Sequence, residues 1–141
     1  MKDKSRDYDI IIIGAGLVGL SASLLMSRKI ENILVIDNKR EDSFHSLPES
    51  EDPYQGVKSI ALSLSSTKIF EALGIWKDIK KDAAISENVH VSSKGDVGSV
   101  VLSASEIGEE VLGYNVANTI LYSSLYRKVK SAKIDFQYDS N

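Results

Sequence analysis

The chain has 141 residues, of which 43% are hydrophobic and 26% are charged, so it can form one ordinary domain with a hydrophobic core. The net charge of −3 gives no reason to expect a nucleic-acid partner, and the absence of cysteine excludes disulfides, thiolate zinc sites and cysteine nucleophiles. The histidines have no metal-ligand spacing and neither GxSxG nor HExxH occurs, so we expect any chemistry to come from a bound cofactor.

An apolar run from Asp7 to Met26, DYDIIIIGAGLVGLSASLLM, opens the chain and allows three interpretations. A secretory signal is disfavoured by a head with three acids beside three bases, although Ser21–Ser23 could imitate a cleavage site. A membrane span is disfavoured because the uncharged stretch Ile10–Ser27 has 18 residues and includes three glycines. A span usually needs about 20 strongly apolar residues.

The order of residues in this run favours the third interpretation, a strand that turns through glycines into a helix. Tyr8–Ile13 has β-branched residues on both faces, which is typical of a central parallel strand buried on both sides. The GxGxxG pattern follows, in which Gly14 permits a tight turn and Gly16 lets the backbone approach a pyrophosphate. Gly19 lets the predicted helix Leu17–Lys29 pack closely on the strand.

A second short strand, Asn32–Asp37, follows the helix and ends in an acid. Asp37 lies 18 residues after Gly19, close to the spacing expected of a carboxylate that binds ribose hydroxyls. The run therefore predicts a dinucleotide-binding βαβ unit, with a signal peptide as the main alternative. An acid at this place favours an unphosphorylated ribose, as in FAD or NAD.

The sequence pattern of the next part of the chain predicts a loop, a segment in which apolar and polar residues alternate, and two helices. Asn38–Lys58 is polar and reads as a loop that could lie over a ligand. Ser59–Leu64 alternates, and Ser65 and Ser66 are expected to cap a helix that Gly74 ends. A short helical stretch, Ile75–Lys81, follows, in which Trp76 is expected to pack in the core.

A hairpin pattern then interrupts the alternation of strands and helices. Glu87–Ser93 and Ser99–Ala104 alternate at period two around Lys94–Gly98, which predicts an antiparallel pair from a second sheet. Thr119–Ser131 is again helical, with tyrosines four residues apart that suggest packing, and Lys133–Tyr138 reads as a further strand.

Three blocks of this sequence resemble the FAD-dependent aromatic hydroxylases of ubiquinone biosynthesis: DYDIIIIGAGLVGLSASLLM, KSIALSLSSTKIFEALGIW and NVHVSSKGDVGSVVLSASEIG. The resemblance implies an α/β fold, with a Rossmann-like FAD-binding βαβ unit and an inserted antiparallel hairpin from a substrate-domain sheet. It implies an FAD-binding part at 1–84, the start of the substrate sheet at 85–112 and a return to the FAD-binding domain at 113–141. Since such hydroxylases are much longer, the domain is expected to be incomplete.

The same resemblance implies the site and its chemistry. An FAD cofactor, with NAD(P)H as co-substrate and dioxygen, would hydroxylate a phenol or polyprenyl phenol. The family has arginine where this chain has Lys58, and an acidic or amide side chain near the isoalloxazine where it has Ala117. No catalytic base and no metal ligand is assigned. The expected cofactor-binding residues are Gly14, Ala15, Gly16, Leu17, Val18, Gly19, Asp37 and Lys58.

The resemblance also implies a cytoplasmic protein, peripheral at the inner membrane face, with contact to the membrane or to other ubiquinone-pathway proteins. The alternatives are another FAD-dependent oxidoreductase and a non-catalytic truncated remnant. On the remnant hypothesis, the chain expressed alone aggregates and retains little FAD. A simple NAD dehydrogenase is disfavoured by the hairpin at Glu87–Ala104.

Overall fold

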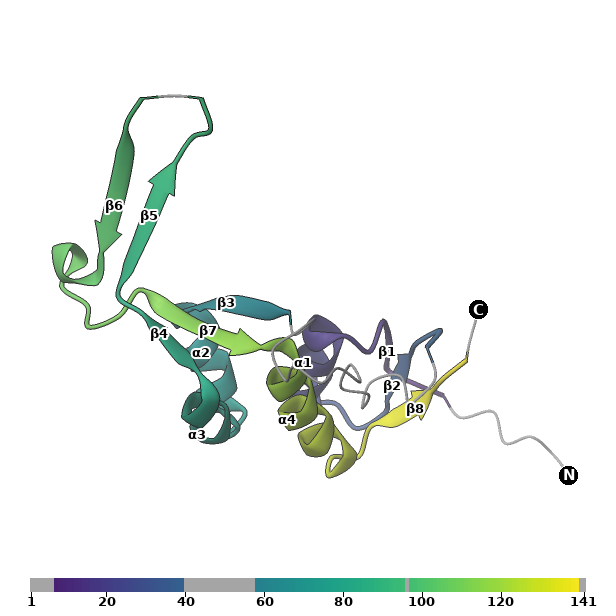
Figure 1. The fold of residues 1–141 in the computed structure, drawn as a ribbon. Coiled ribbons are helices and arrows are strands. Elements are labelled where there is room, and N and C mark those ends of the chain that lie inside the picture. The colour runs from purple at the N-terminus through teal and green to yellow at the C-terminus, as the bar shows by residue number, and fades with distance from the viewer. Residues whose placement is uncertain (1–6, 40–57, 96, 140–141) are drawn as a thin grey trace, which may run out of the picture. The chain divides into compact units, whose positions relative to one another are not determined.

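A computed structural model describes residues 7–39, 58–95 and 97–139, so nearly all of the predicted loop Asn38–Lys58 lies outside the described residues. The chain divides into two compact units (Figure 1). The first is formed by the described residues of Met1–Val57 and Thr119–Asn141, and the second by those of Lys58–Asn118. Each unit is described by itself.

The first unit is a three-stranded parallel sheet with two helices. Its elements are β1 (Ile10–Ile13), α1 (Leu17–Met26), β2 (Ile33–Ile36), α4 (Asn118–Lys130) and β8 (Asp135–Gln137). The strand order is β1-β2-β8, and both pairs run parallel. The predicted strand–glycine turn–helix–strand order is therefore confirmed.

The core of this unit forms between β2 and the apolar stripes of the helices. Leu121, Leu125 and Val129 of α4 are spaced four residues apart and are all fully buried, as one face of a helix requires. Tyr122 and Tyr126 follow the same spacing, and their rings stack with centroids 6.0 Å apart, which confirms the packing interpretation. The other buried apolar side chains of these elements are Leu20, Leu24, Ile33, Leu34 and Val35.

Two expectations for this unit differ from the structure. Helix α1 ends at Met26, before the predicted Lys29, because the chain tightens into a turn in which Lys29 N and Ile30 N both donate to Met26 O at 3.0 Å. β1 is an edge strand among the described strands, and its Ile11 and Ile13 are 55% and 88% exposed. The expected burial of this strand on both faces is therefore not met by the described residues.

The second unit contains an antiparallel sheet with strand order β3-β7-β4. Its sheet and helices are β3 (Ser59–Ser63), α2 (Leu64–Ala72), α3 (Trp76–Ile79), β4 (Ala84–Ser86) and β7 (Gly113–Ala117), with a 3₁₀ turn at Lys80–Asp82. Figure 1 shows α2 and α3 together on one face of this sheet. The opposite face carries small and polar side chains.

The start of α2 corrects a detail of the sequence analysis. The N-cap is Ser63, whose Oγ accepts a hydrogen bond from Ser66 N at 3.3 Å, and not Ser65 or Ser66. Ser63 is still in extended conformation as the last residue of β3, so the helix begins directly where the strand ends. Gly74, with φ +74°, ends this helical segment as expected.

Trp76 anchors the core of the second unit. Its ring lies edge-on to that of Tyr114, with centroids 4.9 Å apart and an interplanar angle of 74°. Only 7% of Trp76 is exposed, which confirms the packing interpretation. The neighbouring buried side chains from β3, α2, α3 and β7 are Leu62, Phe70, Leu73, Ile79 and Val116.

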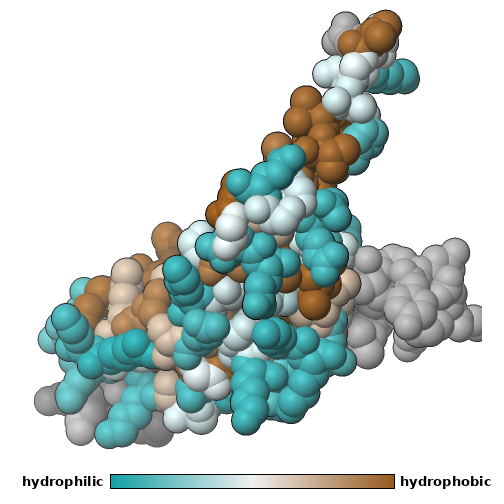
Figure 2. Space-filling model, turned by 90° about the vertical axis from the view of Figure 1, so that its left-hand side faces the viewer, coloured by the Kyte–Doolittle hydropathy of each residue, from teal (hydrophilic) through white to brown (hydrophobic). Residues whose placement is uncertain are grey.

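The predicted hairpin is present as β5 (Asn88–Ser92) and β6 (Ser99–Ser103), paired antiparallel. The register places Val89 opposite Leu102 and Val91 opposite Val100, so these four side chains share one face. All four are exposed, and Figure 2 shows apolar surface along the hairpin.

Replacing Trp76 tests the core of the second unit. We expect Trp76→Ala to lower the free energy of unfolding by about 3–5 kcal/mol, because it removes a large buried ring and its contact with Tyr114. Val97→Ala, at a fully exposed position, is the control and should change it by less than about 0.5 kcal/mol. Chemical denaturation of both variants measures this, and equal stabilities would contradict the assigned core.

Candidate functional site

The turn between β1 and α1 is held by backbone geometry. Gly14 has φ +103°, a conformation that side chains with a Cβ rarely adopt, and its N–H donates to Ile36 O at 2.7 Å. A Cβ on Gly19 would collide with the carbonyl oxygen of Gly14. Both glycines are therefore required for the chain to turn this sharply and for α1 to approach β1.

Gly16 has a different role in the same turn. It has φ −75°, which any residue can adopt, and a Cβ built on it would meet no atom within 4 Å. The space beside Gly16 is therefore open. As N-cap of α1, Gly16 offers no capping side chain, so the first N–H groups of the helix and the positive end of its dipole face that space. This arrangement suits a phosphate group.

The carboxylate of Asp37 lies directly against the turn. Its Oδ2 accepts a hydrogen bond from Ala15 N at 2.6 Å, and its Oδ1 accepts one from Lys39 N at 2.8 Å. Asp37 N in turn donates to Gln137 O at 3.0 Å, which ties the end of β2 to β8. Each carboxylate oxygen keeps a lone pair for a further donor, such as a ribose hydroxyl.

Lys58 and Ala117 belong to the second unit, where strand pairing brings them together. Ser59 pairs with Ala117 across β3 and β7, and Asn118 N donates to Lys58 O at 2.8 Å. The two positions at which the sequence departs from the hydroxylase pattern are thus backbone neighbours. Lys58 and Ala117 are 59 positions apart in the sequence, and that spacing did not indicate that strand pairing would make them neighbours.

The open face of the β3-β7-β4 sheet was not foreseen from the sequence. Ala61, Ser63, Gly113 and Asn115 line a cavity of about 380 Å³ there, and Asn115 Nδ2 donates to Ser86 Oγ at 2.8 Å. By strand alternation Ala117 lies on this same face. The lining also includes Val89 and Leu112 and no Asp, Glu, His, Lys or Arg, so the cavity offers mainly apolar contacts and no carboxylate, imidazole or amine.

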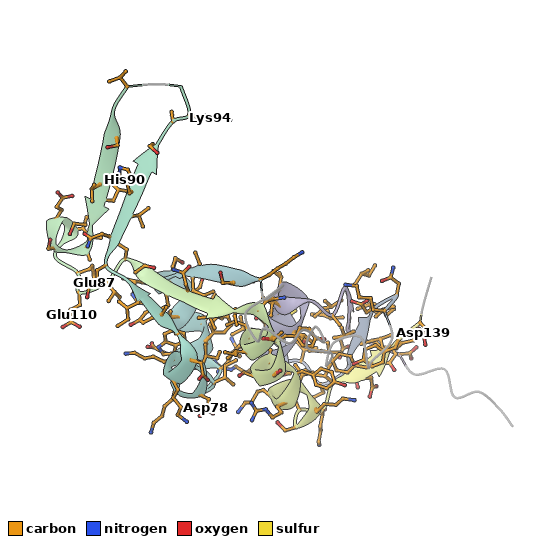
Figure 3. The ribbon with its side chains drawn as sticks, in the orientation of Figure 1. Asp78, Glu87, His90, Lys94, Glu110 and Asp139 are labelled. Carbon is orange, nitrogen blue, oxygen red and sulfur yellow. The ribbon has the colours of Figure 1, made fainter. Side chains whose placement is uncertain are left out.

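Among the described residues of the second unit, the ionisable side chains do not converge on a catalytic cluster. Asp78 on α3 forms an exposed ion pair with Lys81 at 2.9 Å, while His90 and Lys94 lie along the hairpin (Figure 3). Within the described ranges there is no group of three His, Cys, Asp or Glu able to hold a metal ion. In the same ranges, no helix is both long and apolar enough to cross a membrane.

The structure thus brings together most of the expected site residues, the whole turn Gly14–Gly19 and Asp37, in the first unit. Lys58 lies in the second unit beside Ala117.

Known proteins resemble this chain in both sequence and fold. A family model described as an FAD binding domain matches residues 7–138. The chain is 24% identical over 127 residues to 3-demethoxyubiquinol 3-hydroxylase of Escherichia coli, covering 90% of this chain and 31% of that protein. It is 25% identical over 150 residues to the mitochondrial ubiquinone biosynthesis monooxygenase COQ6 of Dictyostelium discoideum, covering 91% and 28%.

Solved structures with the same fold include a variant of 2-methyl-3-hydroxypyridine-5-carboxylic acid oxygenase, with a TM-score of 0.68 at 15% identity. Another is p-nitrophenol 4-monooxygenase of Pseudomonas putida, with a TM-score of 0.64 at 11% identity. Each match covers 94% of this chain and 31% of the other protein. The chain therefore spans less than a third of the length of these proteins.

Two glycine variants separate folding of the turn from ligand binding. We expect Gly16→Ala to leave thermal unfolding unchanged but to weaken FAD binding by at least about tenfold, because its methyl group enters the open space beside the helix. Gly19→Ala should weaken both, because its Cβ collides with Gly14 O. Thermal unfolding and FAD titration measure the two effects, and unchanged binding in Gly16→Ala would contradict the assignment.

The carboxylate of Asp37 is tested by Asp37→Asn. The two donors bond to different carboxylate oxygens, and in the amide one of these becomes an NH2 group that cannot accept, so we expect the free energy of unfolding to fall by about 1–2 kcal/mol. We also expect FAD affinity to fall by about tenfold or more. Asp9→Asn is the matched control, since the Asp9 carboxylate accepts an exposed hydrogen bond from Asn32 Nδ2 at 3.1 Å and lies outside the turn. Equal effects of the two substitutions would contradict the role of Asp37.

Proposed function

This chain belongs to the FAD-binding domain family, and on that premise we propose that it forms the FAD-binding part of a flavin-dependent monooxygenase that hydroxylates a phenol. The observation that carries the proposal is the open space beside Gly16, which faces the N-terminus of α1 with Asp37 fixed on the same turn. A pyrophosphate and a ribose require these two features side by side.

The contacts within the turn support separate roles for its residues in this proposal. Ala15 N already donates to Asp37, so the pyrophosphate is left to the N–H groups of Gly16, Leu17 and Val18 at the start of α1. Asp37 accepts from the adenosine ribose while it holds the turn closed. When bound, FAD supplies the redox chemistry that takes electrons from a reduced nicotinamide and delivers one oxygen atom of dioxygen to the substrate.

In the second unit, the open face of the β3-β7-β4 sheet suits contact with a planar molecule. The side chains of Ala61, Ser63 and Asn115 are small or neutral, and a flat ring can approach a sheet face of this kind closely. Lys58, which stands where related hydroxylases have arginine, carries a positive charge directly before β3, and its backbone O accepts from Asn118 N. This chain's contribution is to bind and orient the cofactor, which fits the lack of an acid–base cluster among the described residues.

The names of two relatives support a substrate class. The E. coli protein is named as a hydroxylase of 3-demethoxyubiquinol and the Dictyostelium protein as a monooxygenase of ubiquinone biosynthesis. We therefore assign a polyprenyl phenol as substrate, with NAD(P)H as electron donor. Such a substrate partitions into membranes, which favours a cytoplasmic protein in peripheral contact with the inner membrane and with other enzymes of that pathway.

The proposal is tested with the natural polypeptide that contains these residues, produced from its own gene. We expect visible flavin absorbance and NAD(P)H oxidation that increases when a polyprenyl phenol is added, with one atom of labelled dioxygen found in the product. Bound flavin without phenol-dependent incorporation would instead favour another oxidoreductase. Folded protein without flavin would favour a non-catalytic remnant.

Lys58 can be tested by its charge. We expect Lys58→Ala to lower the FAD content of the purified polypeptide several-fold, and Lys58→Arg to retain it, since arginine keeps the charge. Lys68→Ala, at an exposed position on α2, is the control and should leave FAD content unchanged. If Lys58→Ala retains full FAD content, Lys58 has no role in binding the cofactor.

A further inference from the structure

The C-terminal ends of α1 and α4 lie at the same edge of the parallel sheet in the first unit. The chain after α1 enters β2, and the chain after α4 enters β8. β2 and β8 are neighbouring parallel strands, and Leu34 near the start of β2 pairs with Asp135 at the start of β8. Both connections therefore reach the amino ends of these strands, so residues far apart in the sequence meet at one edge.

This edge carries many basic side chains, and all of them are exposed. We call it the basic edge and define it by Arg28, Lys29, Arg127, Lys128, Lys130 and Lys133. The acidic residues of the same connections and strand starts are fewer, namely Asp7, Asp9, Glu31 and Asp135. The edge is therefore positive, although the whole chain has a net charge of −3.

The helix dipole accounts for only part of this charge. Arg127, Lys128 and Lys130 belong to the last turn of α4, where the partial negative charge of a helix C-terminus favours basic residues. Arg28, Lys29 and Lys133 lie beyond the helices, since α1 ends at Met26 and α4 at Lys130. The dipole effect falls off beyond the last turn, so these three charges need another explanation.

Exposed apolar side chains accompany the basic ones. Leu25 and Met26, the last two residues of α1, are 38% and 40% exposed close to Arg28 and Lys29. The Nζ atom of Lys130 lies 5.3 Å from the centroid of the Tyr126 ring and 5.9 Å from that of Phe136, so its charge sits over aromatic surface. Basic groups beside exposed apolar side chains are typical of surfaces that bind at the lipid headgroups.

We propose that the basic edge binds the headgroups of an anionic membrane, with Leu25 and Met26 entering the boundary between headgroups and acyl chains. The choice of a membrane rests on the proposed function, in which a polyprenyl phenol comes from the lipid phase. Each basic side chain near an anionic surface strengthens binding by about fivefold. The glycine turn and Asp37 lie at the carboxyl ends of β1 and β2, so the opposite edge of the sheet is left for the lipid.

A nucleic acid fits the basic edge less well. Its phosphates would also attract the six basic side chains, but they offer no apolar partner for Leu25 and Met26. The acidic residues at the edge and the net charge of −3 also oppose a long polyanion. Binding of duplex DNA is therefore the competing outcome of the experiment.

Vesicle sedimentation of the natural polypeptide, produced from its own gene, tests the proposal. We expect vesicles of phosphatidylcholine mixed with phosphatidylglycerol to bind at least about tenfold more tightly than pure phosphatidylcholine, and less tightly as salt is added. Equal binding to both kinds of vesicle, or binding to neither, would overturn the proposal. Tight binding of duplex DNA without preference for anionic vesicles would assign the edge to a nucleic acid and overturn it as well.

Removal of three charges locates the binding surface. We expect the variant with Arg127→Gln, Lys128→Gln and Lys133→Gln to bind anionic vesicles at least about tenfold more weakly. The matched control removes three exposed lysines of the second unit, through Lys68→Gln, Lys77→Gln and Lys94→Gln. The control changes the net charge equally and should weaken binding by about threefold at most. Equal losses in the two variants would contradict the basic edge, and thermal unfolding checks that both are folded.

The flavin absorbance of the same samples separates this proposal from the proposed function. Both triple variants should keep their FAD content, because none of the six substituted residues belongs to the glycine turn or contacts Asp37. Flavin-free protein whose vesicle binding needs Arg127, Lys128 and Lys133 would contradict the monooxygenase and support the lipid surface. Flavin-loaded protein that ignores lipid charge would contradict the lipid surface alone.

Discussion

The close approach of α1 to β1 is the constraint on which the first unit depends. Only hydrogen fits at the α-carbon of Gly19, because any larger group would occupy the place of the Gly14 carbonyl oxygen. This contact sets the start of the helix, and the start of the helix determines where its free N–H groups point. Asp37, which directly follows β2, then joins that strand to the turn by accepting a hydrogen bond from Ala15 N. The open space beside Gly16 follows from these contacts.

Antiparallel pairing has a comparable role in the second unit. The register of β3 and β7 places Lys58 next to Asn118 and aligns Ala61 with Asn115 on the open face. On the opposite face, the contact between Trp76 of α3 and Tyr114 of β7 packs the sheet against the helices. The open face therefore belongs to a sheet that is held in place by a packed core. The cofactor contacts proposed for these residues, which are far apart in the sequence, thus depend on one pair of strands.

The sequence predicted the local elements well because their signals are local. Glycine order and the acid after the second strand located the turn and Asp37, and alternation around Lys94–Gly98 located the hairpin. Spacing could suggest that Asp37 binds a ribose, but not that it accepts from Ala15 N, since this depends on how β2 ends beside the turn. The cavity beside Asn115 escaped prediction because it depends on the register of three strands.

Titration of ¹⁵N-labelled protein with ADP, which carries the ribose and pyrophosphate of the FAD adenosine half, tests the central claim most directly. The account expects saturable changes in the amide signals of Gly14–Gly19 and of Asp37, with AMP binding more weakly because it lacks the second phosphate. Saturable binding of ADP that leaves these amides unchanged, or equal binding of AMP and ADP, would contradict it.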